Sequence, residues 1–242
     1  MSGAFIKSLL ICFSVILVVT QAGAQKPKAE KFAYAVERSR DAARILPLLT
    51  GLPDDGIPKE LIDRTSAIGV FPKVERETTY FTHMIHGYGV ISVHRNDDWT
   101  MPAFYQFGGA GYGNPFSEKE NYGVVLLFFG QDAVDSFEKG GVRLNKEKQT
   151  IAGPVGAITE AQRKELESAR VIAYAYYNGK LKGTEYNSRF ALNPDNNINT
   201  PLYGMKGREI LAGKEPDPAT LPDGIAAYRE ALKKYYDRQQ RK

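Results

Sequence analysis

The sequence predicts an α+β fold, in which a twisted antiparallel sheet curls into a barrel or sandwich and is flanked by short helices, with an amphipathic helix at each end. Apolar residues recur at three- and four-residue steps over residues 28–49 and again from Ile225 to Tyr235, which is typical of amphipathic helices. Between them lie short runs rich in β-branched and aromatic residues, bounded by glycine, proline and asparagine. Asn178-Gly179, between two apolar stretches, has the composition of a two-residue hairpin turn.

Residues 1–24 have the pattern of a cleavable signal peptide. Lys7 precedes an apolar run from Leu9 to Val19 that is too short to cross a bilayer as a helix. Ala22 and Ala24 are the small residues that a signal peptidase requires, so we expect cleavage after Ala24 and a periplasmic or secreted protein of the bacterial cell envelope. The alternative is an uncleaved membrane anchor. The only cysteine lies inside this segment, so the mature chain has no disulfide, and its stability must come from a core.

Local patterns predict the remaining elements. Residues 124–129 are continuously apolar, which indicates a strand buried on both faces. Thr159 and Gln162 have the spacing of a capping box. In chain order, we expect helices at 28–49, from Pro58 through Ile62, at 131–139, at 159–168 and after residue 222, with helical turns near Leu202 and at 208–211. We expect strands at 67–71 (closed by Pro72), 89–93, 99–107, 124–129, 171–177 and 181–192, a polar loop at 193–199 and a proline-rich linker at 213–222.

These elements divide the chain into four parts. They are the signal peptide (1–24), an N-terminal helical segment (25–56), a β-rich domain (57–213), and a linker with a basic C-terminal helix (214–242).

Three glycines predict a groove on the sheet. Gly109, Gly111 and Gly113 alternate along an expected strand and therefore share one face. A strand face without side chains lets a ring, an acyl chain or another backbone approach closely. The alternative is a strongly bent strand in a barrel.

No motif for catalysis, a metal or a cofactor stands out. The sequence contains no GxSxG, HExxH or phosphate-loop pattern, so we expect no enzyme and no cofactor. His83 and His86 are three residues apart in an expected strand and would point to opposite faces, which disfavours a metal site. The oxygen-rich residues Asp195, Asn196, Asn197 and Asn199 fit turn and capping roles better than calcium binding. A serine hydrolase stays open as an alternative, because its triad is defined in space and not in sequence.

The charge distribution indicates an anionic surface as the partner. The formal net charge of +4 is too small for a dedicated nucleic-acid-binding domain. Basic amphipathic helices lie in anionic headgroup layers with their apolar side down. We therefore expect lipid-binding residues at both ends of the chain: Lys28, Lys31, Arg38, Arg40, Arg44, Lys233, Lys234 and Arg238. The alternative is that both helices pack their apolar faces on the β core.

A series of sequence blocks resembles the SYLF domain family. The blocks occur in family order across about residues 57–213: Ile57 to Ile62, Ala67 to Val74, Gly87 to Val93, the W-x-x-P-A-F block from Trp99 to Phe104, Ala152 to Gly156, Leu202 to Gly204 and Arg208 to Leu211. The region from Ala173 to Gly183 and the charged stretch from Arg143 to Lys148 depart from the family pattern.

The resemblance implies a non-catalytic domain that binds lipid, partly through a basic amphipathic N-terminal segment. Eukaryotic members of the family bind phosphoinositides and some bind actin. A secreted bacterial protein does not meet actin unless it comes from a pathogen, so actin is not an expected partner.

The sequence thus favours a non-catalytic envelope protein that binds anionic phospholipid at a membrane surface. The alternative is a structural module that binds another envelope protein. Such a module would use an exposed sheet edge or the tyrosine-rich hairpin with Tyr174, Tyr176, Tyr177 and Tyr186.

Overall fold

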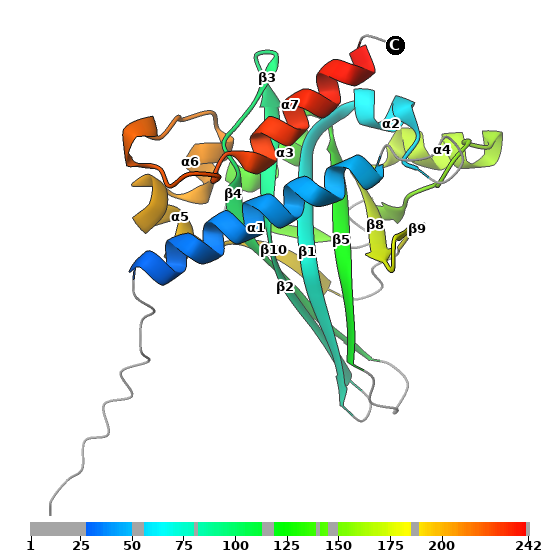
Figure 1. The fold of residues 1–242 in the computed structure, drawn as a ribbon. Coiled ribbons are helices and arrows are strands. Elements are labelled where there is room, and N and C mark those ends of the chain that lie inside the picture. Colours follow the sequence, from blue (N-terminus) through cyan, green and yellow to red (C-terminus); the bar gives the residue numbers. More distant parts are fainter. Residues whose placement is uncertain are drawn as a thin grey trace, which may run out of the picture.

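The computed structural model describes residues 28–49, 56–79, 82–112, 119–138, 141–144, 150–184 and 189–240. The expected signal peptide, Gly113 and Tyr186 lie outside these ranges. The fold class predicted from the sequence is confirmed, because the described chain is a curled sheet with helices packed on it (Figure 1).

The helices are short except for those at the two ends. They are α1 (Lys28–Leu49), α2 (Lys59–Asp63), α3 (Gly130–Glu138), α4 (Glu160–Ser168), α5 (Asn196–Tyr203), α6 (Gly207–Leu211), the 3₁₀ turn η2 (Pro218–Thr220) and α7 (Ala227–Gln240). The capping box predicted for α4 is present: the Gln162 backbone N–H donates to Thr159 Oγ1, and the Thr159 N–H donates to Gln162 Oε1 at 2.9 Å.

The strands form one sheet in the order β6-β10-β4-β2-β1-β5-β8-β7, with β3 added to β2 and β9 added to β8. Their bounds are β1 (Thr65–Thr79), β2 (Thr82–Arg95), β3 (Asp98–Trp99), β4 (Ala103–Tyr112), β5 (Lys119–Phe129), β6 (Val142–Leu144), β7 (Thr150–Ala152), β8 (Val171–Tyr177), β9 (Lys180–Gly183) and β10 (Arg189–Pro194). The pairs are antiparallel except β7 with β8, which is parallel. In Figure 1 the long strands β1, β2 and β5 extend well beyond the end of the sheet that the helices cover.

An aromatic cluster fills the inner face of the curled sheet. The Phe107 ring lies 5.4 Å from that of Phe71 and 5.6 Å from that of Phe190. Phe137 of α3 enters the same cluster, with its ring centroid 5.0 Å from that of Phe128. As predicted, Val124 to Phe128 of β5 are buried on both faces.

The two terminal helices pack on the sheet and on each other. Ser39 Oγ of α1 donates to the Ile225 carbonyl at 2.7 Å and accepts from the Tyr228 N–H at 3.1 Å. The Tyr228 hydroxyl of α7 in turn donates to the Ile68 carbonyl of β1 at 3.0 Å. Of the two arrangements that the sequence left open, the structure therefore shows the packed one.

Three predictions of local structure are wrong. Pro72 does not end its strand: β1 continues to Thr79, because a shift of register between Val70 and Lys73 accommodates a residue without an N–H. The expected strand 181–192 is two strands, since β9 pairs with β8 whereas β10 pairs with β4 and β6. The expected loop 193–199 holds the end of β10 and the start of α5, which begins at Asn196.

Candidate functional site: an aromatic face beside the first helix

Two exposed tyrosines lie beside one arginine where the edge of α1 meets the uncovered part of β2, and an exposed methionine lies four residues from one of them on the same face of that strand. Tyr34 is 41% exposed, Tyr88 43% and Met84 63%. The Arg38 guanidinium carbon lies 4.4 Å from the centroid of the Tyr88 ring and 5.9 Å from that of Tyr34. Both distances are within the range of a cation–π contact. We call Tyr34, Arg38, Met84 and Tyr88 the tyrosine face.

The packing of α1 explains why these side chains are exposed. Its buried stripe consists of small residues near the start, Ala35, Ser39 and Ala42, which lets the helix lie close to the sheet. Tyr34 and Arg38 are one turn apart and flank this stripe. On β2, Val90 lies beneath the helix layer and is fully buried, whereas the strand runs on toward residue 84 beyond the cover of the helix.

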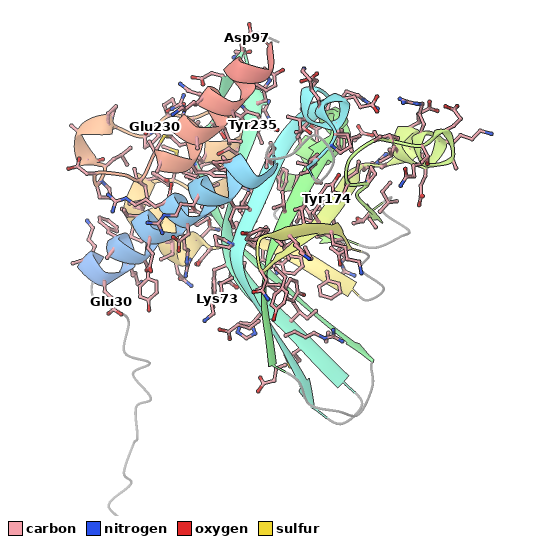
Figure 2. The ribbon with its side chains drawn as sticks, turned by 45° about the vertical axis from the view of Figure 1, so that its right-hand side comes forward. Glu30, Lys73, Asp97, Tyr174, Glu230 and Tyr235 are labelled. Carbon is pink, nitrogen blue, oxygen red and sulfur yellow. The ribbon has the colours of Figure 1, made fainter. Side chains whose placement is uncertain are left out.

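Ion pairs hold the charged residues of this region. Arg38 Nη1 lies 3.5 Å from the carboxylate of Asp195, a buried residue that immediately precedes α5. Lys73 Nζ lies 2.7 Å from Glu75 Oε1, and this hydrogen bond raises the pKa of Lys73. His86 Nε2 lies 3.3 Å from the other oxygen of Glu75. Figure 2 shows Lys73 on the sheet below α1.

Arg40 and Arg44, which were also predicted, do not share this face. Arg40 and Arg44 line a groove of about 550 Å³ along the opposite flank of the helix, and Arg44 Nη1 lies 2.7 Å from Asp41. The acidic residues of this groove outnumber its two arginines: they are Glu37, Asp41 and Asp223. Lys28 Nζ lies 5.3 Å from the centre of the Phe32 ring, and Lys31 is half-buried.

The C-terminal basic residues are partly neutralised. Lys233 Nζ and Arg229 Nη2 lie 2.8 Å and 2.9 Å from the same oxygen of Asp98. Partial burial raises the pKa of Asp98, but the hydrogen bonds from Lys233, the Trp99 N–H and Arg229 outweigh it and lower the pKa overall. Lys234 is exposed, and the side chain of Arg238 lies outside the described part. Whether these residues contact lipid stays a prediction.

The predicted glycine groove lies on the inner side of the sheet. Gly109 of β4 pairs with Ile85 of β2 on one side and with Phe190 of β10 on the other. Gly111 pairs with His83 of β2. Because Phe190 belongs to the aromatic cluster of the inner face, a ligand at these glycines would lie inside the curl of the sheet, away from the tyrosine face.

Only part of the tyrosine-rich hairpin is exposed to solvent. Tyr174 is fully buried, its hydroxyl donates to the Pro154 carbonyl at 3.0 Å, and burial raises its pKa. It is therefore not available to a partner, contrary to the prediction. Tyr177, beside the Asn178-Gly179 turn, is 58% exposed. Within the described ranges, no three histidine, cysteine or acidic side chains are grouped in a way that would hold a metal ion.

Sequence reasoning missed three of the four residues of the tyrosine face. Arg38 was predicted, but Tyr34, Met84 and Tyr88 were not. The available signal was the alternation along β2, where Met84, His86 and Tyr88 share one face and Ile85, Gly87 and Gly89 share the other.

The fold and this surface define a class of protein: a β-rich α+β domain, closed at one end by helices, with an exposed face of tyrosine, methionine and arginine. Comparison with known proteins shows similarity to one family. The family described as "Ysc84: Las17-binding protein actin regulator" matches residues 119–235. The chain is 24% identical over 211 residues to "SH3 domain-containing YSC84-like protein 1" of Rattus norvegicus and to that of Mus musculus, and 23% identical to that of Homo sapiens.

Together with the ordered sequence blocks, these matches show that the chain is similar to the SYLF family, as the sequence predicted. The alignments cover 84% of this chain but only 61% of each relative. Among the helices of the described ranges, none combines the length and the apolar character needed to cross a membrane.

Proposed function

We propose that this protein is a non-catalytic, lipid-binding component of the bacterial cell envelope, and that it binds anionic phospholipid at a membrane surface through the tyrosine face. The observation that carries the proposal is the pair of exposed rings, Tyr34 and Tyr88, on either side of Arg38, with exposed Met84 further along the same face of β2. Tyrosine favours the boundary between water and an apolar phase, since its ring is apolar and its hydroxyl is polar. Methionine fills irregular apolar surroundings, and arginine pairs with phosphate.

Three cations lie on or beside the tyrosine face. Lys31 and Arg38 are on the flank of α1 that contains Tyr34, and Lys73 pairs with Tyr88 across β1 and β2. The acidic residues of this side are Glu30, Glu75, Glu77 and the buried Asp195; Glu75 is paired with Lys73, and Asp195 with Arg38. The attraction to an anionic layer therefore depends on these three side chains reaching the headgroups directly, and not on a net positive charge of the flank.

The packed arrangement favours one flank of α1 as the lipid contact. The apolar stripe of the helix is buried against the sheet and α7, so it reaches a bilayer only if the helix detaches. Lys31 and Arg38 lie on the flank that contains Tyr34, which lets them meet headgroups while the fold stays intact. The resemblance to the SYLF family supports lipid as the ligand, and the pattern of residues 1–24 supports the envelope as the location.

Vesicle flotation of residues 25–242 tests the proposal. We expect the protein to float with vesicles that contain phosphatidylglycerol and to float less with pure phosphatidylcholine vesicles. A variant with Tyr34→Ser, Met84→Ser and Tyr88→Ser loses the apolar part of the contact. Partial burial of three such side chains is worth about 1 kcal/mol each, so the partition coefficient should fall by about 100-fold.

Tyr177→Ser is the matched control, because Tyr177 is the most exposed tyrosine of the described chain and lies on the β8–β9 hairpin. Its partition coefficient should equal that of the unmodified protein. Equal loss in both variants would instead point to the hairpin surface. Absence of flotation with anionic vesicles at low salt would refute lipid binding.

A further inference from the structure

One titratable side chain lies within the tyrosine face. His86 is two residues from Met84 and two from Tyr88 on β2, so all three side chains point to the same side of the sheet. All three are exposed. A histidine in this position touches whatever surface contacts its two neighbours.

Two carboxylates and one ammonium group lie on the strand next to His86. Its partner across β1 is Glu75, whose carboxylate lies 3.3 Å from His86 Nε2 and 2.7 Å from Lys73 Nζ. Its partner across β4 is Gly108, which has no side chain. From α1, the nearest charged group on this face is Arg38, which stacks on Tyr88. Further along β1, Glu77 pairs with Met84.

Lys73, Glu75, Glu77 and His86 together therefore have a net charge of −1 when the imidazole is neutral and no net charge when it is protonated, so protonation removes a repulsion between this face and an anionic surface. Histidine is the side chain whose charge ordinarily changes between about pH 5 and 8. The charge appears between two side chains that would contact the lipid, and not at a distant site.

We propose that protonation of His86 strengthens binding of the protein to an anionic lipid surface, so that membrane association increases as the pH falls below neutral. This inference rests on the proposed function and adds its regulation. One additional basic charge near an anionic membrane raises the partition coefficient by about fivefold. Acidic conditions at a membrane would then retain the protein, and neutral conditions would release part of it.

Flotation of residues 25–242 at about pH 8 and about pH 5.5, on phosphatidylglycerol-containing vesicles and on pure phosphatidylcholine vesicles, tests the inference. The unmodified protein should bind the anionic vesicles about fivefold more tightly at the lower pH. His86→Gln should bind at both pH values as the unmodified protein does at the higher one. His86→Lys should bind at both as the unmodified protein does at the lower one. Circular dichroism at each pH confirms that all three are folded.

The outcomes separate this inference from the proposed function. If the unmodified protein binds anionic vesicles but shows no increase at low pH, or if His86→Gln keeps the increase, the role of His86 is wrong and lipid binding stands. If the unmodified protein does not bind at either pH, the proposed function fails and this inference fails with it. An equal increase on pure phosphatidylcholine would also contradict the inference, because the attraction requires an anionic surface.

Discussion

Replacing Asn199 by alanine is expected to destabilise the protein by about 2–4 kcal/mol. Asn199 is fully buried in α5, where its Oδ1 accepts from the Phe104 N–H at 2.8 Å and its Nδ2 donates to the Phe104 carbonyl at 2.9 Å. The Asn199 side chain thus makes the two hydrogen bonds to the Phe104 backbone that a neighbouring strand would otherwise make at the start of β4. It also fixes α5, and with it Asp195, the partner of Arg38.

The size of this loss of stability follows from the backbone groups that Asn199→Ala leaves without a hydrogen-bond partner. The Phe104 carbonyl also accepts from the Asp195 N–H at 2.8 Å, so it keeps one partner. The Phe104 N–H has no replacement partner in the described structure, and a buried unpaired donor costs about 1–3 kcal/mol. The lost second hydrogen bond adds about 1 kcal/mol.

Thermal unfolding measures the effect. For a chain of this size, a loss of about 3 kcal/mol lowers Tm by roughly 6–12 °C. Asn197→Ala is the matched control, because Asn197 is exposed on the same helix and its replacement should change stability by less than about 0.5 kcal/mol. Equal Tm values for the two variants would refute the role of Asn199.

Three further predictions concern stability. Gly89→Ala should cost about 3 kcal/mol or more in unfolding free energy, because its Cβ would lie 2.2 Å from the Val70 carbonyl oxygen. Gly108→Ala should cost less than half as much unfolding free energy, because its Cβ would lie 3.4 Å from its nearest neighbour, the Ile85 carbonyl oxygen. Urea unfolding that finds Gly108→Ala less stable than Gly89→Ala would contradict this packing. Thr159→Ala removes the cap of α4 and should cost about 1 kcal/mol, so an unchanged urea midpoint would contradict it. The lowered pKa of Asp98 means that its contribution to stability is present above the unfolded-state pKa of about 3.9 and is lost as the pH falls through the lower folded value. The Tm difference between Asp98→Asn and the unmodified protein should therefore shrink between pH 7 and about pH 3, and a constant difference would contradict this.

Local chemistry predicted much of the fold. The capping box of α4 and the buried strand β5 depend on neighbours in sequence or on composition, and both are confirmed. The Asn178-Gly179 turn is also confirmed, with positive φ values of 49° and 78°. These features need no knowledge of distant residues.

The wrong predictions concern features that distant residues decide. Proline normally ends a strand, but the register shift of β1 against β2 and β5 lets Pro72 stay inside it. The sequence around Asn199 is polar and reads as a loop, yet its helix is fixed by hydrogen bonds to Phe104. No window of local sequence contains both partners.

The tyrosine face was also predicted only in part, because residues far apart in the sequence form it. Basic residues in an amphipathic helix indicated the first helix, and Arg38 is at the centre of the tyrosine face. Tyr88 is exposed on that face because α1 covers β2 only beyond this residue. How much of β2 the helix covers depends on how α1 packs, which the local sequence does not show. The charge of α1 is also divided between two flanks by its rotation on the sheet, so that Arg40 and Arg44 lie away from Arg38.

The depth of the tyrosine face in a bilayer can be measured with a single fluorescent label. The chain after residue 24 has no cysteine, so Met84→Cys and Tyr177→Cys each offer one site for an environment-sensitive fluorophore. With vesicles that contain phosphatidylglycerol and brominated acyl chains, we expect a blue-shifted and quenched label at position 84 and an unshifted, unquenched label at position 177. A label at position 84 that stays in water while the protein is bound would show that the tyrosine face does not contact the lipid.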